Sequence, residues 1–202
     1  QYHPHGNLER MTDLSPEIHI GLSMQDIDAR QWDRLVAGRS PFLTHAFLLA
    51  LEESGSVQAD TGWQPCHVMV TDKVGKLLAA MPLYIKQHSY GEYVFDWGWA
   101  DAYQRHGQRY YPKLLTAIPF TPSQSPRILV EEGESVQHWL ALIKQAVLQY
   151  ADQIEASSWH VLFPDSQSAD ALQKTDMIRR EACQFHWRNK AYGSFDDFLA
   201  TF

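Results

Sequence analysis

The stretch from Tyr90 to Phe120 carries the residues best suited to chemistry. Nine of its 31 residues are aromatic, against 16 of the other 171, so its composition differs from that of the rest of the chain. Asp96 and Asp101 lie among these rings. A carboxylate partly buried against indole rings has a raised pKa, which suits a general base that deprotonates an amine near neutral pH. We therefore expect Asp96 to be a catalytic base.

The side chains around these aspartates are suited to form the walls of an amine pocket, because tryptophan and tyrosine combine an apolar face with a polar tip. Lys113 could pair with an acidic group of the acceptor, although a lysine that opens a strand is more often solvated. The alternative is that the aromatic rings fill the core of a long insertion and the aspartates cap turns. The expected substrate-binding residues are Trp97, Trp99, Asp101, Tyr103, Tyr110, Tyr111, Lys113 and Phe120.

Histidine and cysteine offer fewer candidates. We expect His186, next to Trp187, to carry a proton, with a purely structural histidine as the alternative. The chain has no His-Glu-x-x-His pattern, and Cys66 and Cys183 are far apart, so no metal site is expected. It also lacks a Gly-x-Ser-x-Gly elbow, a P-loop and a dinucleotide fingerprint. These absences argue against a hydrolase, a kinase and a dehydrogenase.

Composition and charge limit the class of protein. A chain of 202 residues, with 45% apolar and 20% charged residues, suits one full globular domain. A net charge of -7 offers no general basic surface for a nucleic acid, so we expect no DNA partner. No apolar run approaches the roughly 18 residues that span a bilayer, and the polar start does not read as an export signal. We therefore expect no transmembrane segment and a cytoplasmic location.

Hydrophobic periodicity and capping residues predict the elements that position these side chains. Ser23 and Asp26 have the spacing of a capping box, Ser135 caps the clearest helix, and Pro82 indicates an edge or a bulge in its strand. This order indicates an α/β (α+β) fold with a mixed, mainly antiparallel sheet flanked by helices. The predicted strands cover residues 18–22, 66–71, 76–86, 113–119, 127–130, 159–163 and 182–188. The predicted helices cover residues 23–37, 44–54, 136–150, 169–174 and 195–202.

The chain divides into three parts by composition. Residues 1–13 are expected to be a loose polar tail, and residues 14–193 one domain. Ser194 is the expected N-cap of a helix over residues 194–202 that leads to a further part of the protein.

Several stretches resemble the FemAB-like predicted N-acyltransferases of the GNAT superfamily, which are described as peptidoglycan biosynthesis or recognition proteins. The resemblance implies two tandem GNAT-like halves, of which this chain is the first. It also implies an amine acceptor, such as one on a peptidoglycan precursor, and acyl-CoA or aminoacyl-tRNA as the donor. The stretches that carry it are Pro41–Phe47 with Leu51–Val57, Ser89–Tyr103, Tyr110–Leu114 leading to Pro119–Pro122, and more weakly Phe185–Trp187 with Ser194–Leu199.

Acidic residues stand where such a fold places the donor. GNAT domains that bind acyl-CoA usually hold its pyrophosphate with a Gly-rich loop and a helix N-terminus, because free N–H groups attract anions. Here that place reads Glu131, Glu132, Gly133, Glu134 and Ser135, and three carboxylates repel phosphate. We therefore expect no cofactor site in this half and expect the missing C-terminal half to bind the donor and any tRNA.

Two functions follow from these residues. The first is transfer of an acyl or aminoacyl group to an amine, with this half forming the acceptor side and inactive alone. The alternative is a non-enzymatic recognition module that binds a cell-wall fragment or a protein partner.

Overall fold

A computed structural model describes residues 16–94 and 96–202 of the chain. Four strands rich in apolar residues build its first sheet. The strand order is β1-β3-β4-β7, and every neighbouring pair is antiparallel. The sheet therefore matches the mainly antiparallel arrangement that the sequence predicts. Its strands are β1 (Glu17–Leu22), β3 (His67–Thr71), β4 (Leu77–Met81) and β7 (Leu129–Val130).

This sheet separates two apolar cores, because successive side chains of a strand point to opposite faces. Val68 and Val70 of β3 belong to the core beneath α4 (Val136–Gln153). Ala80 of β4 and Leu129 of β7 belong to the other core, with α1 (Ala29–Val36) and α2 (His45–Glu53). The first sheet is thus covered by helices on both faces.

A second sheet follows the order β2-β5-β6-β8, where the sequence predicts a single sheet. Pro82 explains the difference: β4 ends just before it, and the predicted strand over residues 76–86 continues into the other sheet as β5. Proline lacks the N–H that a ladder needs, so it marks a break between sheets and not a bulge. β2 and β6 are antiparallel to β5, while β6 and β8 are parallel. The strands are β2 (Trp63–Pro65), β5 (Tyr84–Lys86), β6 (Lys113–Thr116) and β8 (Trp159–Val161).

Capping side chains fix where the helices begin. The Ser23 and Asp26 capping box closes only the short 3-10 turn η1 (Met24–Asp26), and α1 starts after Asp28, whose side chain accepts from the Gln31 N–H. Ser135 caps α4, as predicted. The remaining helices are α3 (Trp97–Arg105), α5 (Ser166–Gln173), α6 (Phe195–Leu199) and the 3-10 turns η2 (Pro41–Leu43) and η3 (Ala59–Thr61). No helix in the described parts of the chain is long and apolar enough to cross a bilayer.

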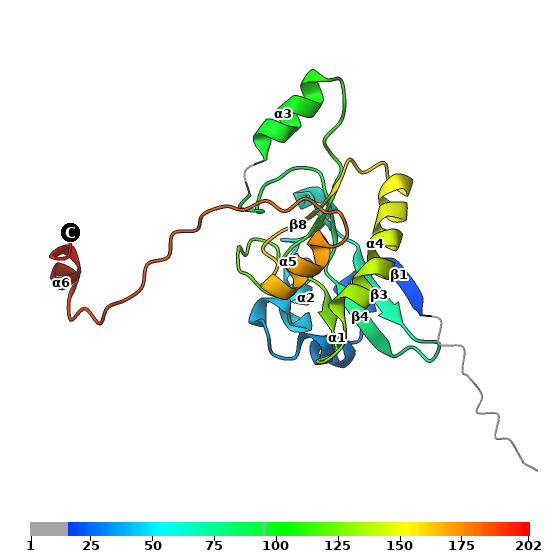
Figure 1. Ribbon diagram of the computed structural model, residues 1–202, viewed down its shortest axis with the longest axis horizontal. Coiled ribbons are helices and arrows are strands. Elements are labelled where there is room, and N and C mark those ends of the chain that lie inside the picture. Colours follow the sequence, from blue (N-terminus) through cyan, green and yellow to red (C-terminus); the bar gives the residue numbers. More distant parts are fainter. Residues whose placement is uncertain (1–15, 95) are drawn as a thin grey trace, which may run out of the picture.

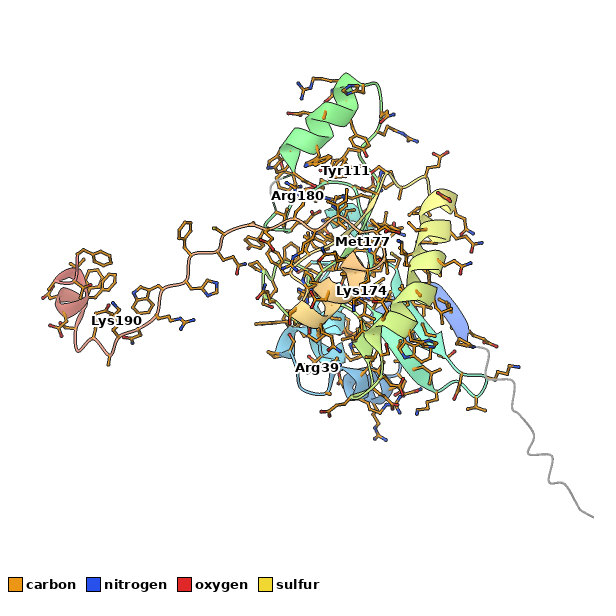
Figure 2. The ribbon with its side chains drawn as sticks, viewed as in Figure 1. Arg39, Tyr111, Lys174, Met177, Arg180 and Lys190 are labelled. Carbon is orange, nitrogen blue, oxygen red and sulfur yellow. The ribbon has the colours of Figure 1, made fainter. Side chains whose placement is uncertain are left out.

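The strand predicted over residues 182–188 is wrong. These residues form no regular secondary structure, and Phe185 is 100% exposed. The alternation of apolar and polar residues is typical of a half-buried strand, but a strand also needs a neighbour that accepts its hydrogen bonds. The segment instead runs away from the body of the protein towards α6, and Lys190 lies well outside that body (Figures 1 and 2).

The predicted divisions at the two ends have different outcomes. Ser194 caps α6, and its side chain accepts a hydrogen bond from the Asp197 N–H, as the sequence predicts. The expected tail over residues 1–13 lies outside the described residues. That α6 leads into a further part of the protein stays a prediction.

The core beneath α4 provides a test of the fold. Ile143 is completely buried there, so Ile143→Ala removes buried methyl groups and leaves a cavity. We expect a loss of about 2 to 5 kcal/mol in the free energy of unfolding, measured by urea denaturation. Gln149→Ala on the exposed side of the same helix is the control and should change it by less than about 0.5 kcal/mol. Equal effects of the two changes would contradict this packing.

Candidate functional site

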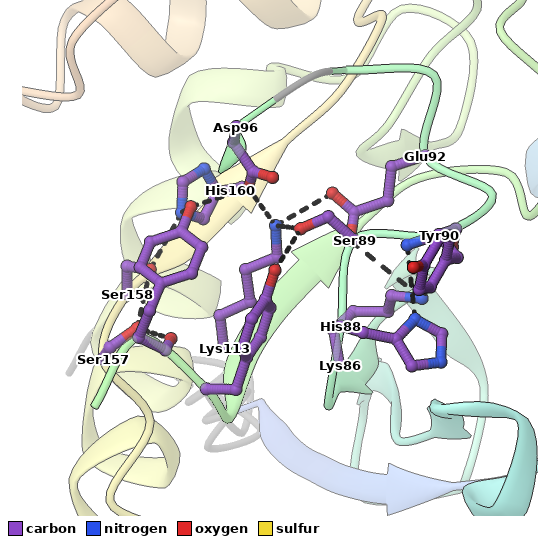
Figure 3. A network of polar contacts seen from close by, with 12 residues as sticks. Lys86, His88, Ser89, Tyr90, Glu92, Asp96, Lys113, Ser157, Ser158 and His160 are labelled. Atoms are coloured by element: carbon purple, nitrogen blue, oxygen red, sulfur yellow. Dashed lines mark hydrogen bonds and ion pairs between the residues drawn. The ribbon is translucent and has the colours of Figure 1, made fainter. Parts of the chain in front are cut away.

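Lys113 is the centre of a buried polar network, although the sequence suggests a solvated lysine. It opens β6 with its side chain completely buried. Its ammonium donates to Asp96 Oδ2 at 2.6 Å, to Glu92 Oε2 at 2.9 Å and to Ser89 Oγ at 2.9 Å (Figure 3). A buried charge is tolerated only when it is paired and hydrogen-bonded. The two carboxylates therefore account for the buried position of Lys113.

The loop after β5 brings these acids over β6 through a turn at Gly91. Gly91 has a φ of +79°, and a Cβ at this position would lie 2.6 Å from the Phe120 ring. Only glycine fits both the left-handed backbone and the close contact. The Phe120 N–H also donates to the Gly91 carbonyl at 3.2 Å. This turn allows the loop to bring Glu92 and Asp96 within hydrogen-bond distance of Lys113.

A second buried lysine lies beside the first. Lys86 ends β5 and is directly opposite Lys113 in the ladder. Like charges at paired positions destabilise a sheet, so both ammonium groups need compensation. The Lys86 ammonium donates to the Tyr90 carbonyl at 3.2 Å, lies 3.5 Å from the centre of the Trp63 ring, and is 4.0 Å from Glu92 Oε1. When both lysines are protonated, their charges thus balance those of the two carboxylates inside the protein.

Tyr110 connects this network to β8. Its hydroxyl donates to Asp96 Oδ2 at 2.7 Å and is 3.5 Å from His160 Nε2. The same histidine nitrogen is 2.8 Å from Ser158 Oγ. Asp96 therefore receives hydrogen bonds from residues on β6 and on the segment before it, and His160 stands next in the chain of contacts (Figure 3).

One oxygen of each carboxylate remains without a donor. Glu92 Oε1 and Asp96 Oδ1 are both buried and have no hydrogen-bond partner within the described part of the chain. Leaving a buried acceptor unsatisfied costs about 1 to 3 kcal/mol. The network is therefore suited to a ligand that supplies N–H donors.

The pKa values assign different roles to the two acids. Burial alone raises the pKa of Asp96, but hydrogen bonds from Lys113 and Tyr110 outweigh it and hold the pKa below its ordinary value. The expected raised pKa of Asp96 is therefore wrong, because the sequence gives no sign of its buried cation. Burial raises the pKa of Glu92, and the charge of Lys113 offsets only part of this. Glu92 is thus the better proton acceptor of the two.

Two bases in the network also have shifted pKa values. Burial lowers the pKa of Lys86 to about 7, and the charge of Lys113 lowers it further, against the opposing effect of Glu92. Burial lowers the pKa of His160 to about 4, helped by Lys113. Near neutral pH, His160 is therefore uncharged and Lys86 is only partly protonated.

The structure brings part of the predicted acceptor pocket together. Asp96, Tyr110 and Lys113 are in direct contact, and the Tyr111 hydroxyl is 2.8 Å from Ser89 Oγ in the same network. Asp96 stands at the N-cap of α3 but its side chain makes no capping bond, so turn capping does not explain it.

The predicted residues on α3 touch the network through two aromatic contacts and do not join its hydrogen bonds within the described part of the chain. None of the helix's residues is buried, and the helix stands out from the body (Figure 1). Trp97 and Trp99 are 44% and 51% exposed, so they do not fill a core. Trp97 contacts Tyr90, and Tyr103 contacts Tyr110, at ring-centre distances of 5.3 and 5.2 Å.

Within the described residues, three other predicted residues make no hydrogen bond or ion pair with the two lysines. Asp101 is exposed on α3. Phe120 is 41% exposed, and its ring centre is 5.4 Å from that of Trp63. His186 is exposed on the C-terminal segment, where Nε2 is 3.2 Å from the Gln184 amide oxygen. The structure therefore does not place His186 with Asp96.

Four members of the network were not predicted from the sequence. Lys86 and His160 lie on strands. A charged or polar residue within an otherwise apolar strand is the one sequence feature that could have indicated them. Glu92 follows Gly91 inside the aromatic stretch itself. Ser89 gave no signal.

The acidic residues before α4 line a shallow hollow of about 290 Å³, together with Arg39 and Gln167. Glu131 is paired with Arg34 at 3.1 Å and with Lys76 at 3.5 Å, which offsets part of the negative charge. The other lining residues are Ala37, Val130, Glu132, Gly133 and Glu134. The expectation that no cofactor binds in this half stays a prediction.

The comparison with protein families gives a clear result. A family model described as FemAB-like, peptidoglycan biosynthesis/recognition, matches residues 23–202. The chain belongs to the FemAB-like family. No curated protein is similar enough in sequence to count as a match to this FemAB-like chain.

Solved structures show the fold of this FemAB-like chain. It is similar to the aminoglycoside antibiotic 6'-N-acetyltransferase AAC(6')-Ih from Acinetobacter baumannii, with 15% identity, a TM-score of 0.50 and coverage of 87% of this chain and 99% of that one. It is also similar to the aminoglycoside N-acetyltransferase AAC(6')-Iy in complex with CoA, with 12% identity, a TM-score of 0.53 and coverage of 88% and 97%. The fold is that of GNAT acetyltransferases, as the sequence resemblance implies.

The buried ion pairs of the FemAB-like chain predict a large effect of removing Lys113. Lys113→Met leaves two buried carboxylates without their cation, so we expect a loss of about 3 to 5 kcal/mol in the free energy of unfolding. The measurement is urea denaturation at pH 7. The control is Arg109→Met, which breaks an exposed pair with Glu155 at 3.0 Å and should cost less than about 1 kcal/mol. A loss for Lys113→Met as small as the control's would show that the lysine is solvated.

Proposed function

We propose that this chain forms the amine-acceptor side of an N-acyltransferase. The observation that carries the proposal is the pair of buried carboxylate oxygens, Glu92 Oε1 and Asp96 Oδ1, that lack donors beside Lys113. A primary amine supplies N–H groups that such oxygens can accept. The similarity to N-acetyltransferase folds supports the reaction class.

Asp96 then positions the amine and does not act as its base. Its lowered pKa keeps it ionised near neutral pH, and its Oδ2 is already held by Lys113 and Tyr110. A fixed carboxylate can hold an amine nitrogen with its lone pair directed at an acyl carbonyl. During transfer the N–C bond forms, the amine loses a proton, and the donor's leaving group departs.

The exposed aromatic side chains above the network are suited to the body of the acceptor. Tyr90, Trp97 and Phe120 are all more than a third exposed and close to the loop that carries Glu92. Aromatic faces bind apolar surfaces and the carbons next to a cation. The family description supports an acceptor on a peptidoglycan precursor.

The donor binds outside the start of α4 in this proposal. The residues there do not fit a coenzyme pyrophosphate, since the hollow is acidic and the Ser135 cap already accepts the His138 N–H. A second GNAT-like half, which the FemAB-like resemblance implies, would hold acyl-CoA or aminoacyl-tRNA.

Acyl transfer by the full-length protein tests the proposal. The donors are acetyl-CoA and an aminoacyl-tRNA, the acceptors are propylamine and a lysine-containing muropeptide, and the product is detected by mass spectrometry. We expect transfer with one donor and a loss of about 100-fold or more in kcat/KM for Asp96→Asn, because the amine is no longer held. Asp152→Asn on the exposed side of α4 is the control and should leave the rate unchanged.

The acidic hollow also favours a second candidate, a recognition module without catalysis. In that case, the full-length protein binds the muropeptide through the Lys113 network but transfers no group from either donor. Binding that is lost in Asp96→Asn, with no product, would support the module and contradict the enzyme. Full transfer activity in Asp96→Asn would show that the network is not needed for either proposed function.

A further inference from the structure

The network can accept an added positive charge only if it loses one of its own positive charges. When both are protonated, Lys86 and Lys113 balance the charges of Glu92 and Asp96. An alkylammonium at the free oxygens would make the buried cluster net positive, which is costly in a medium of low dielectric constant. One lysine must therefore be uncharged at the moment when an ammonium binds.

Geometry singles out Lys86 as that lysine. Lys113 donates three hydrogen bonds of 2.6 to 2.9 Å, two of them to carboxylates. Lys86 donates to one backbone carbonyl and is 4.0 Å from the free oxygen Glu92 Oε1. Losing a proton thus breaks fewer strong interactions at Lys86 than at Lys113.

We propose that the site binds a primary alkylammonium at Glu92 Oε1 and Asp96 Oδ1, and that Lys86 receives its proton through Glu92. This inference rests on the proposed function and names the proton acceptor that the reaction needs. An N–H bond of the ammonium breaks as an O–H bond forms at Glu92 Oε1. Lys86 Nζ then moves from 4.0 Å to hydrogen-bond distance of Glu92 Oε1, and that O–H bond breaks as an N–H bond forms at the lone pair of Nζ. The ammonium becomes a neutral amine and Lys86 becomes an ammonium, so the charge balances and no other reactant is needed.

The pKa directions agree with this route. The pKa of Lys86 is lowered to about 7 by burial and by Lys113, against Glu92 and Asp96, so a neutral amine is available near pH 7. The pKa of Glu92 is raised by burial, which suits an intermediate carrier. His88 also faces Lys86, whose charge contributes, after burial, to lowering the pKa of His88.

Access to the network involves α3. Trp97 at its start contacts Tyr90, whose carbonyl accepts from Lys86. None of the helix's side chains is buried, so moving the helix aside exposes little apolar core.

Proton release on amine binding is the direct test. Propylammonium chloride is added to the full-length protein in a pH-stat, and binding is followed by NMR through the Trp63 indole N–H, next to Lys86. At pH 6, where Lys86 is mostly protonated, about one proton should be released per bound amine, and at pH 8 almost none. The dissociation constant should be about tenfold higher at pH 6 than at pH 8.

Variants separate Lys86 from the rest of the network. Lys86→Met removes a buried charge without adding a polar group, so it should fold, bind propylammonium and release no proton at either pH. Glu92→Gln should weaken binding and abolish the release. Lys174→Met removes an exposed lysine at the C-terminal end of α5, outside the network, and should behave as the wild type. Tetramethylammonium, which has no N–H group, should bind far more weakly than propylammonium.

The outcomes distinguish this inference from the proposed function. Amine binding with proton release that depends on Lys86, but no acyl transfer, supports the inference and contradicts the enzyme. Acyl transfer that is undiminished in both Lys86→Met and Glu92→Gln overturns the inference and leaves the enzyme standing. Absence of propylammonium binding, equal binding of tetramethylammonium, or the same release in Lys86→Met also overturns the inference.

Discussion

The ammonium of Lys113, buried between Glu92 and Asp96, is the interaction on which the rest of the candidate site depends. A lysine at the start of a fully buried strand cannot remain charged unless carboxylates pair with its ammonium. The loop after β5 brings them, because Gly91 allows the turn that Phe120 packs against. This pairing holds the loop over β6 and is, after burial is overcome, the first cause of the lowered pKa of Asp96.

The GNAT-like scaffold explains why such a cluster can exist on the two central strands of the second sheet. Helices cover both faces of the first sheet, and Ile85 of β5 and Leu114 of β6 also belong to the core beneath α4. The same two strands carry two lysines at paired positions, Lys86 and Lys113. The stability of the main core offsets the cost of a buried polar cluster, which leaves its groups available for binding.

Local signals predicted much of the fold but little of the polar network. The caps at Ser135 and Ser194 and the alternation around Val68 and Val70 are short-range features, and the structure confirms them. The paired position of Lys86 and Lys113 depends on strand register, which no local pattern reveals. The same reason explains why Asp96 was recognised as important while the sign of its pKa shift was wrong, since its cation lies 17 residues away in the sequence.

A double-mutant cycle between Lys113 and Asp96 tests the central claim most directly. The free energy of unfolding is measured by urea denaturation for the wild type, Lys113→Met, Asp96→Asn and the double variant at pH 7. We predict that the single losses do not add, with a coupling energy of about 1 to 3 kcal/mol, because each change removes the same ion pair. Additive losses, within about 0.5 kcal/mol, would contradict the claim that this pair organises the site.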